Sequence, residues 1–362
     1  MKLICTQENL KTGLTAASRI ISSINTLPIL NNLLLKTEEG QLKIFSTNLE
    51  LAINTAIGCK VEKEGQTTVV AKTFNELVNN LPNNNLLLEN ENGKLLIQTE
   101  NQTFKIKTLP AEEFPFIPQN QNNNPIILEP ESFKAAINQV SFAVSTNQAQ
   151  PEISGIYFLL RAGEVRLAAT DRYRLAEKII KGQGEGEVII PQKCAVELAR
   201  VLAGGVEKLE ASINENQIFF STGRTQIVSR LVDGQYPDYK SIIPESFNTT
   251  ISVDRNKLYG ALKTNALFSQ GTNSVKLEYS QAEQKLTISS ESQELGSGVV
   301  DIASKVEGGS GNLLLNFRYV LDFLSQVSGE KIMVKVVNDS SPAVFSVEGD
   351  SNYLYLVMPI KI

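Results

Sequence analysis

The chain repeats one pattern three times at a stride of about 122 residues, and this repeat limits the possible folds more than any single motif does. Near the start of each copy, apolar residues recur at the spacing of one helix face, and a second such stripe follows about 60 residues later. The first stripes are Leu10, Leu14, Ala17 and Ile21; Phe133, Ile137 and Val140; and Leu258, Leu262 and Ala266. The second stripes are Phe74, Leu77, Val78 and Leu81; Ala195, Leu198 and Leu202; and Phe317, Val320, Leu321 and Leu324. The stride is too long for a solenoid, so each copy is expected to be a domain with its own core.

Strand-like segments repeat between these stripes. Residues 40–44 match residues 163–167, and both segments lead to a Thr-Asn or Thr-Asp pair. Gly, Asn and Pro bound the alternating segments, as is typical of strands and turns. We therefore predict an α+β fold of three repeated domains, each with two helices and antiparallel sheets. The predicted domains span residues 1–124, 125–248 and 249–362, with the Asn-rich run 120–124 as a linker. Chance similarity between ordinary α+β segments is the alternative.

The absence of certain residues limits the chemistry. The chain contains no histidine, which excludes Ser-His-Asp and Cys-His nucleophilic sites and histidine-based zinc motifs. It also lacks a phosphate-binding Gly-x-x-x-x-Gly-Lys-[Ser/Thr] loop and a dinucleotide-binding glycine fingerprint. Its 39 Asp and Glu residues leave carboxylate catalysis open, but no pair stands out. An enzyme is therefore the weaker hypothesis, and we expect neither a cofactor nor a metal site.

Cysteine usage and hydropathy indicate the compartment. No apolar run reaches the ~18 residues of a membrane span, and the start of the chain lacks a signal-peptide core. Cys5, Cys59 and Cys194 are few and far apart, so we expect free buried thiols in a reducing environment. The sequence predicts a cytoplasmic protein.

Two segments stand out from the repeat. Residues 168–176 read as a strand, a turn and a return strand that would place Tyr173 and Arg174 at an exposed edge. The alternative is a plain strand connection in which Thr170 and Asp171 bond the local backbone. The second segment, residues 353–362, is apolar almost to its last residue, which is unusual for a terminus. It is either an edge strand of the third domain or a strand whose end leaves the sheet and lines an apolar groove.

These segments, taken together, resemble the bacterial DNA polymerase III beta subunit, the replicative sliding clamp. The resemblance spans the whole chain and rests on residues 26–30, 169–171 with 174–176, 231–234 with 236–239, and 357–359. It implies a head-to-tail homodimer of three-domain subunits that closes a six-domain ring around duplex DNA, with helices lining the hole. It further implies a non-catalytic processivity factor that tethers the polymerase to DNA and also binds the clamp loader and repair proteins.

The resemblance also implies a groove between the second and third domains that binds short peptide motifs of these partners. Aliphatic walls with a few polar groups would suit an extended peptide. Matched one by one, the groove residues are Ile153, Thr170, Arg172, Tyr173, Arg174, Leu175, Pro237, Ile242, Asn316, Tyr319, Ala343, Val357, Met358, Pro359 and Ile360. Three positions differ from the family pattern: Arg172 replaces a common glycine, Tyr173 a common histidine and Ser241 a common arginine. These differences concern peptide preference.

A net charge of −5 does not suit ordinary DNA binding, which depends on phosphate neutralisation. A ring needs only weak positive potential on its inner helices, because it is held by topology. The cations expected to face DNA are Lys11, Arg19, Lys72, Lys134, Lys193, Arg200, Arg255, Lys257, Lys263 and Arg318. Ile24 stands where relatives often carry arginine, so DNA contacts in that loop are not expected to follow the family.

The alternation of apolar and basic residues in 103–107 predicts an edge strand at the subunit interface. Phe104 and Ile106 are expected to pack on Leu267 and Phe268 of another copy. Two alternatives remain open at this point: a carboxylate enzyme with its site at a domain interface, and a monomeric peptide-binding module that does not encircle DNA.

Overall fold

The structure of the protein is a computed structural model that describes residues 1–21, 27–120, 125–147, 149–269 and 271–361. Its contacts divide the chain into two compact units. Unit 1 comprises Met1–Lys134 with Lys193–Leu231, and unit 2 comprises Ala135–Gln192 with Val232–Ile362. The second repeat therefore contributes to both units, and the predicted linker lies largely outside the described residues.

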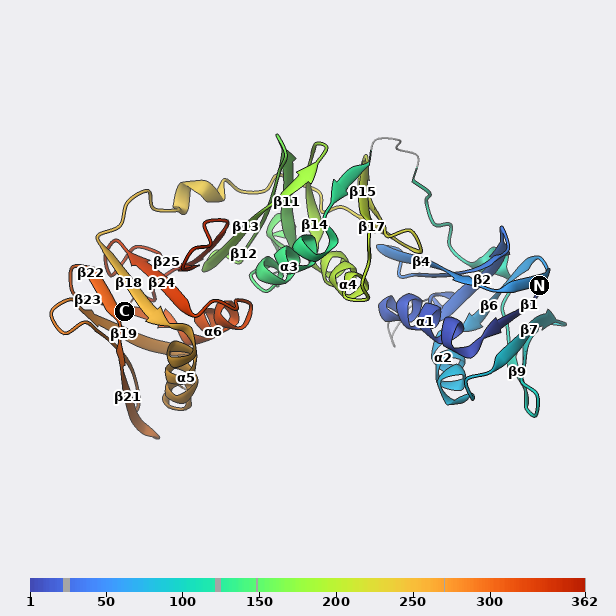
Figure 1. Cartoon of the computed structure of the whole chain (residues 1–362), viewed down its shortest axis with the longest axis horizontal. Coiled ribbons are helices and arrows are strands. Elements are labelled where there is room, and N and C mark those ends of the chain that lie inside the picture. Colours follow the sequence, from blue (N-terminus) through green and yellow to red (C-terminus); the bar gives the residue numbers. More distant parts are fainter. Residues whose placement is uncertain (22–26, 121–124, 148, 270, 362) are drawn as a thin grey trace. The chain divides into compact units, whose positions relative to one another are not determined.

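The helices begin and end close to the predicted apolar stripes. Unit 1 contains α1 (Gln7–Ala17), α2 (Ala71–Asn80) and most of α4 (Gln192–Leu202), and Figure 1 shows α1 beside α2. Unit 2 contains α5 (Arg255–Asn265) and α6 (Phe317–Ser325), while α3 (Pro130–Ser141) crosses the boundary between the units. Side-chain oxygens of Thr6, Asp254 and Asn316 cap α1, α5 and α6, because each accepts a free N–H of the first turn.

Unit 1 has two antiparallel sheets. The smaller sheet has the order β5-β1-β7-β8-β9, and the larger one has the order β6-β2-β3-β4-β17-β16-β15-β10. The strands are β1 (Lys2–Thr6), β2 (Asn32–Glu38), β3 (Gln41–Thr47), β4 (Leu51–Gly58), β5 (Lys60–Lys63), β6 (Gly65–Val70), β7 (Asn85–Glu91), β8 (Lys94–Gln98), β9 (Thr103–Lys107), β10 (Ile126–Leu128), β15 (Leu209–Asn214), β16 (Gln217–Ser221) and β17 (Thr225–Arg230).

Unit 2 also has two antiparallel sheets. The larger sheet has the order β14-β11-β12-β13-β26-β25-β24-β18-β22, and the smaller one has the order β21-β20-β19-β23. The strands are β11 (Gly155–Arg161), β12 (Glu164–Thr170), β13 (Arg174–Gln183), β14 (Gly186–Pro191), β18 (Thr249–Asp254), β19 (Ser274–Ser280), β20 (Lys285–Ser292), β21 (Gly296–Ala303), β22 (Lys305–Gly308), β23 (Gly311–Asn316), β24 (Lys331–Val336), β25 (Ala343–Val347) and β26 (Tyr353–Val357).

One strand pair recurs where successive repeats join. In unit 1, β4 of the first repeat pairs with β17 of the second, and Leu51 lies opposite Ser229. In unit 2, β13 of the second repeat pairs with β26 of the third, and Arg174 lies opposite Val357. Within the described residues, β9 is one edge strand of the smaller sheet of unit 1, and β21 is one edge strand of the smaller sheet of unit 2. Each of these two strands therefore has one open edge.

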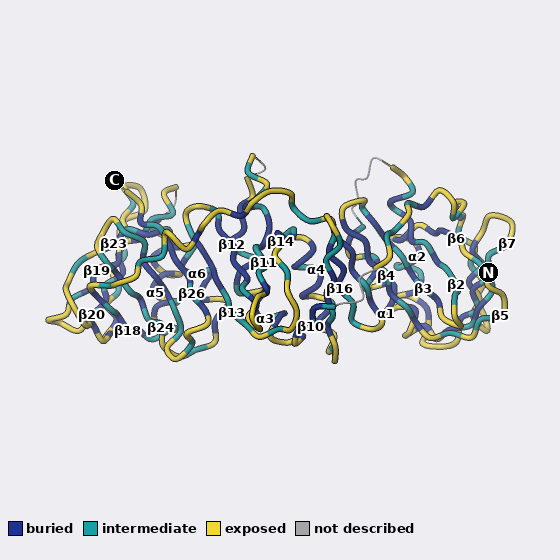
Figure 2. Tube along the Cα trace, turned by 90° about the horizontal axis from the view of Figure 1, so that it is seen from above, coloured by how far each residue is buried: buried dark blue, intermediate teal, exposed yellow. Residues whose placement is uncertain are grey.

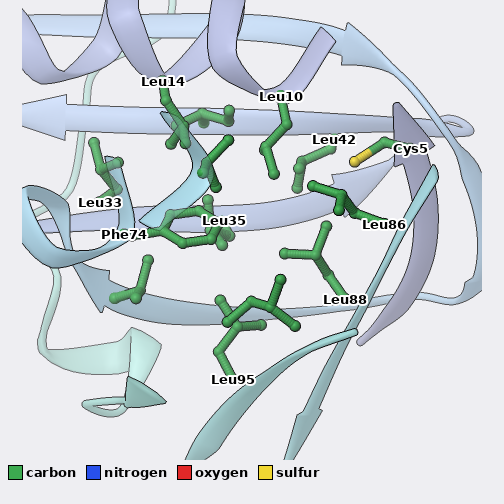
Figure 3. Packing of buried hydrophobic residues seen from close by; sticks show 14 of the residues in the cluster. Cys5, Leu10, Leu14, Leu33, Leu35, Leu42, Phe74, Leu86, Leu88 and Leu95 are labelled. Carbon is green, nitrogen blue, oxygen red and sulfur yellow. The ribbon is translucent and has the colours of Figure 1, made fainter. Parts of the chain in front are cut away.

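The buried faces of the helices confirm most of the predicted stripes, although Ile21, Leu77, Ala266 and Leu321 are only half-buried. In the core of the first repeat, Leu10 and Leu14 of α1 meet Phe74 of α2 and apolar residues of the sheets, and Figure 3 shows these side chains pointing toward one another. Figure 2 shows buried residues along the strands and helices and exposed residues at the connecting turns. Ile21, Leu81 and Ala266 of the predicted stripes follow α1, α2 and α5 instead of lying within them.

Some predictions about single residues need correction. Cys5 and Cys194 are buried free thiols as expected, but Cys59 is only half-buried because it lies at the junction of β4 and β5.

Among the described residues, no helix is long and apolar enough to cross a membrane.

Candidate functional site

The turn between β12 and β13 is built by two side chains that bond the local backbone. The hydroxyl of Thr170 donates to the carbonyl of Arg174 (2.7 Å) and accepts the N–H of Arg172 (3.1 Å). The Asp171 carboxylate accepts the N–H groups of Tyr173 and Arg174, each at 3.0 Å. These four bonds hold Arg172 at a φ of +77°, a conformation that side chains other than glycine rarely adopt. The simple strand connection considered from the sequence is therefore present, and it leaves Tyr173 63% exposed.

Arg174 is less exposed than the sequence predicted, because its guanidinium is paired within the molecule. Nε bonds Asp171 at 2.8 Å, and Nη1 bonds Asp322 of α6 at 2.6 Å. The guanidinium carbon also lies 4.4 Å from the centre of the Tyr319 ring, within range of a cation–π contact. Burial lowers the pKa of Arg174, but Tyr355, Asp322 and Asp171 together raise that pKa above its usual value. This cation therefore fastens the turn to the third repeat.

The C-terminal segment leaves the sheet at Pro359, as predicted from the missing N–H of proline. The strand β26 ends at Val357, and the N–H of Met358 still donates to the carbonyl of Tyr173 (2.8 Å). Beyond the proline, the N–H of Ile360 donates to the carbonyl of Leu314 (2.8 Å). The segment is not the exposed apolar strip that the sequence suggested, because Val357 and Pro359 are buried and Met358 is half-buried.

Beneath the turn and the tail lies one apolar cluster, which we call the tail cluster. It joins Ile153, Leu175 and Leu356 to the rings of Tyr236 and Tyr239, with Met358 packed against it. The Tyr236 ring stacks on that of Tyr157 with centroids 5.0 Å apart, and the Tyr239 ring meets both edge-on. Burial raises the pKa of Tyr239, and the bond that its hydroxyl donates to the buried Glu177 raises that pKa further. The tail cluster thus combines aliphatic side chains with two buried tyrosine rings.

The predicted groove residues separate into a buried group and an exposed group. The residues that form the floor or hold its backbone are Ile153, Thr170, Leu175, Ala343, Val357 and Pro359. Half-buried positions are Arg174, Asn316, Tyr319 and Met358, of which Asn316 caps α6. The exposed positions are Arg172, Tyr173, Pro237, Ile242 and Ile360. The exposed group can present whole side chains to a partner, the half-buried residues only part of theirs, and the buried residues set the shape of the surface.

Sequence reasoning did not assign Asp322, Phe142 or Tyr355 to the site. Asp322 pairs with Arg174 from 148 residues away, and the Phe142 ring lies 5.5 Å from the same guanidinium. Tyr355 donates its hydroxyl to the carbonyl of Tyr319 (2.9 Å). The only available signal was the excess of aromatic residues near the C-terminus, which does not indicate their partners.

The cations predicted to face DNA also differ in their surroundings. Lys11, Arg19, Lys72, Lys193, Lys257 and Lys263 are exposed and have no ion pair among the described residues. Lys134 and Arg200 pair with Glu131 and Glu197 on their own helices. Two cations have structural roles: Arg255 donates twice to the carbonyl of Leu324 at the end of α6, and Arg318 donates to Asn273. Ile24 lies outside the described residues.

The predicted interface residues lie at or beside the open edges. Residues 103–107 form β9, an edge strand as predicted, but Phe104 and Ile106 pack partly on the core of their own repeat. The reason is strand alternation, which turns every second side chain of β9 inward. Leu267 is 60% exposed and Phe268 is half-buried in the short helix Ala266–Phe268, which packs on β21.

Comparison with known proteins assigns the three repeats to one family. Models of the N-terminal, central and C-terminal domains of the DNA polymerase III beta subunit match residues 1–118, 127–238 and 240–361. The chain belongs to the DNA polymerase III beta subunit family. The beta sliding clamp of Synechococcus elongatus is 29% identical over the full length of both chains.

Solved structures of beta subunits share the fold over the whole chain. The DNA polymerase sliding clamp of Bacillus subtilis matches with a TM-score of 0.96 and 28% identity, covering 100% of this chain and 99% of that one. A clamp of Pseudomonas aeruginosa bound to griselimycin matches with a TM-score of 0.95 and 26% identity, covering 100% of both chains.

Membership in the beta subunit family defines the activity at a coarse level. The chain is a sliding clamp of DNA polymerase III, a processivity factor and not an enzyme, and its partners are DNA and the polymerase. This excludes the carboxylate enzyme considered from the sequence. Among the described residues, no three Cys, Asp or Glu side chains gather in a way that could hold a metal ion.

Proposed function

We propose that two copies of this chain close head to tail into a ring that encircles duplex DNA. The ring binds its partners through the exposed residues Tyr173, Pro237, Ile242 and Ile360 of unit 2, which we call the tail-side surface. The recurring strand pair carries this proposal. The pairs β4–β17 and β13–β26 join successive repeats. In the third repeat, β21 occupies the place of β4 and β13, and in the first repeat, β9 occupies the place of β17 and β26. Among the described residues, neither β21 nor β9 pairs with a strand of another repeat. An antiparallel pairing of β21 with β9 of another copy would repeat the same joint and satisfy both open edges.

The side chains at the two edges support this pairing. β9 exposes Lys105 and Lys107, which have no ion pair among the described residues, and β21 exposes Asp301, which pairs with Lys285 of the neighbouring strand (3.3 Å). Val299 of β21 is 66% exposed, and Leu267 beside it is 60% exposed, which is unusual for large apolar residues. Opposite charges would set the orientation of the two chains, and the apolar residues would contribute most of the affinity.

The interface is tested by sedimentation. Replacing Leu267→Ala together with Phe268→Ala should convert the dimer into monomers, because both side chains border the β21 edge. The matched control is Phe116→Ala, which removes an exposed aromatic residue of unit 1 and should leave the dimer intact. A double variant that stays dimeric at low protein concentration would remove the support for this interface.

The ring itself is tested by topology. The chain should stay on nicked circular DNA and be released when the circle is linearised, because a ring slides off a free end. Release that does not depend on linearisation would contradict encirclement and favour the non-encircling peptide-binding module.

Helix-borne cations are proposed to guide the DNA. The changes Lys72→Glu, Lys193→Glu and Lys263→Glu, made together, should weaken loading and lower the salt dependence by about one unit of slope for each phosphate that the variant no longer neutralises. A control set with the same charge change, Lys60→Glu, Lys181→Glu and Lys331→Glu, alters exposed strand residues and should have little effect. Equal effects of the two sets would show that net charge alone matters.

The polymerase, the clamp loader and repair proteins are proposed to bind the surface formed by Tyr173, Pro237, Ile242 and Ile360 above the tail cluster. Deleting residues 358–362 should abolish binding of a short peptide that contains Gln, Leu and Phe while leaving the dimer intact, as measured by isothermal titration. The deletion removes Met358, which packs against the tail cluster, and the exposed Ile360. Unchanged peptide affinity in a dimeric truncated chain would contradict this assignment.

Two finer points complete the proposal. We place the domain boundaries near residues 124 and 248, and three separate family matches over residues 1–118, 127–238 and 240–361 support a division into three domains. A cytoplasmic location is supported by the buried free thiols Cys5 and Cys194, which need no oxidising compartment.

A further inference from the structure

The turn of the candidate site has a close counterpart in unit 1. The Thr47 hydroxyl donates to the carbonyl of Leu51 (3.1 Å) and accepts the N–H of Leu49 (3.0 Å). The Asn48 side chain accepts the N–H groups of Glu50 (3.1 Å) and Leu51 (2.8 Å). These are the four bonds of residues 170–174, shifted by 123 positions. Leu49 has a φ of +76° where Arg172 has +77°.

The strand that follows this turn also has the same neighbour. The N–H of Arg230 donates to the carbonyl of Glu50 (2.9 Å), just as the N–H of Met358 donates to that of Tyr173 (2.8 Å). Arg230 ends β17 at the place where the C-terminal tail leaves β26. Unit 1 therefore repeats the backbone frame of the proposed peptide site: the same turn, the same strand pair and the same chain exit.

This second frame surrounds a hollow of about 70 Å³. One wall is the segment Pro115–Pro118, which corresponds to the segment that begins at Pro237 in unit 2, and the floor includes Ala52 and Val228. The volume is roughly half the ~150 Å³ of an engineered cavity that holds benzene, so the hollow suits a single aliphatic side chain.

The rim of the hollow is unusually apolar for an exposed surface. Phe116 is 86% exposed and Leu49 is 54% exposed, although both are large hydrophobic residues. Exposed aromatic and aliphatic residues beside a pocket are typical of recognition sites. Arg230 is exposed on the same rim and has no ion pair among the described residues, so the rim offers a positive charge to a ligand.

We propose that unit 1 carries a second peptide-binding site, which takes an extended partner segment with one Leu-sized anchor beside an acidic residue. The anchor fills the hollow between Ala52, Val228 and Ile117, and the acidic side chain pairs with Arg230. Phe116 and Leu49 cover the anchor. The choice of a peptide ligand rests on the proposed function of the matching site in unit 2, and the acidic residue follows from the charge of Arg230.

The test uses the full-length chain with methyl-labelled Leu, Ile and Met, titrated with the capped peptide acetyl-Gly-Leu-Asp-Leu-Gly-amide. Methyl signals of Leu49, Leu51 and Ile117 should shift, and they report unit 1 separately from Met358, which reports the tail-side surface. Phe116→Ala and Arg230→Glu should each weaken this second site about tenfold or more. Arg224→Glu is the matched control, since Arg224 is exposed on the same hairpin but does not line the hollow. A control peptide with Lys in place of Asp should bind more weakly.

The outcomes separate the two sites. Shifts confined to Met358 would overturn the second site and leave the first one in place, whereas shifts confined to unit 1 would support the second site alone. Binding that survives both Phe116→Ala and Arg230→Glu would overturn the inference. A smaller sedimentation coefficient of Phe116→Ala would also overturn it, because a second copy of the chain would then cover the hollow. Arg230→Glu keeps the test valid if Phe116→Ala lowers the folded fraction.

Discussion

The turns at residues 47–51 and 170–174 have the same backbone conformation but carry different side chains. In each, a Thr hydroxyl and an Asn or Asp side chain make all four bonds to the local backbone, so the residues between them are free to vary. In unit 1, the fifth position is Leu51, which is buried. In unit 2 it is Arg174, which reaches Asp322 in the third repeat.

This difference shows how one duplicated frame can acquire two specialised surfaces. Asp171 both holds its turn and pairs with Arg174, whereas Asn48 only holds its turn. The unit 2 turn therefore depends on a charge network that spans two repeats. The unit 1 turn depends on local bonds and aliphatic packing.

The chain offers a separate probe for each unit. All three cysteines lie in unit 1, all nine tyrosines lie in unit 2, and there is no tryptophan. Thiol labelling therefore reports the unfolding of unit 1, and tyrosine fluorescence reports that of unit 2. Paired substitutions in the two turns can be compared on this basis, from the largest expected effect to the smallest.

The largest expected effect is a difference in reactivity between the thiols of unit 1. Burial raises the pKa of Cys5 and of Cys194 to about 12, so at pH 8 only about one thiol in 10⁴ of each is ionised in the folded chain. Burial raises the pKa of the half-buried Cys59 as well, but its partial exposure should make it the one thiol that reacts quickly. Cys59→Ser should remove the fast phase, and two fast thiols in the native chain would contradict the prediction.

The same shifts predict how stability depends on pH. Because folding raises the pKa of Cys5 and Cys194, their contribution to stability is full below the ordinary thiol value of 9.0 and decreases as the pH rises toward 12.

The next largest effect is the loss of stability when the fifth residue of each turn is replaced, Arg174 in unit 2 and Leu51 in unit 1. Arg174→Met should lower the free energy of unfolding of unit 2 by about 2–4 kcal/mol, because it leaves Asp171 without its cation in a partly buried site. Leu51→Met at the equivalent position should cost less than about 1.5 kcal/mol in unit 1, since it nearly conserves volume. Urea unfolding followed by tyrosine fluorescence and by thiol labelling measures both. Equal costs would contradict the view that the unit 2 turn depends on charge.

A smaller effect on stability isolates the charge of the side chain that accepts two backbone N–H groups in each turn, Asp171 or Asn48. Asp171→Asn keeps both acceptor bonds to the backbone but loses the ion pair, and should cost about 1 kcal/mol. Asn48→Asp keeps both acceptor bonds and adds a partly exposed charge, and should change stability by less than about 0.5 kcal/mol. High salt should reduce the difference between the two substitutions in their effect on the free energy of unfolding. A gap that is unaffected by salt would indicate that hydrogen-bond geometry, not charge, is responsible.

The smallest effect concerns the strained residues. Leu49→Gly and Arg172→Gly should each raise the free energy of unfolding of their own unit by about 0.5–1 kcal/mol, because glycine adopts positive φ without strain. Tyr173→Gly, at a neighbouring position with ordinary φ, should lower it by a similar amount and serves as the control. If Leu49→Gly and Arg172→Gly changed the free energy of unfolding in opposite directions, the two turns would not have equivalent backbones in solution.

Much of the fold follows from local sequence patterns. The apolar stripes predicted most of the buried positions of α1–α6, the alternation in residues 103–107 predicted the edge strand β9, and the Thr-Asp pair predicted the turn before β13. Each of these features depends on residues within about ten positions of one another, where periodicity and turn chemistry act directly. Resemblance over the whole chain supplied the family.

Only the tertiary structure showed which candidate side chains are accessible. The sequence placed Arg174 at an exposed edge and Val357 on an open strip, but the pairing of β13 with β26 buries Val357 and brings Asp322 to the guanidinium of Arg174. The hollow beside Phe116 likewise exists because β4 pairs with β17, whose residues lie more than 150 positions away. A sequence specifies local conformation through neighbouring residues, whereas burial and ion pairing depend on strand register between distant segments, which no local pattern encodes.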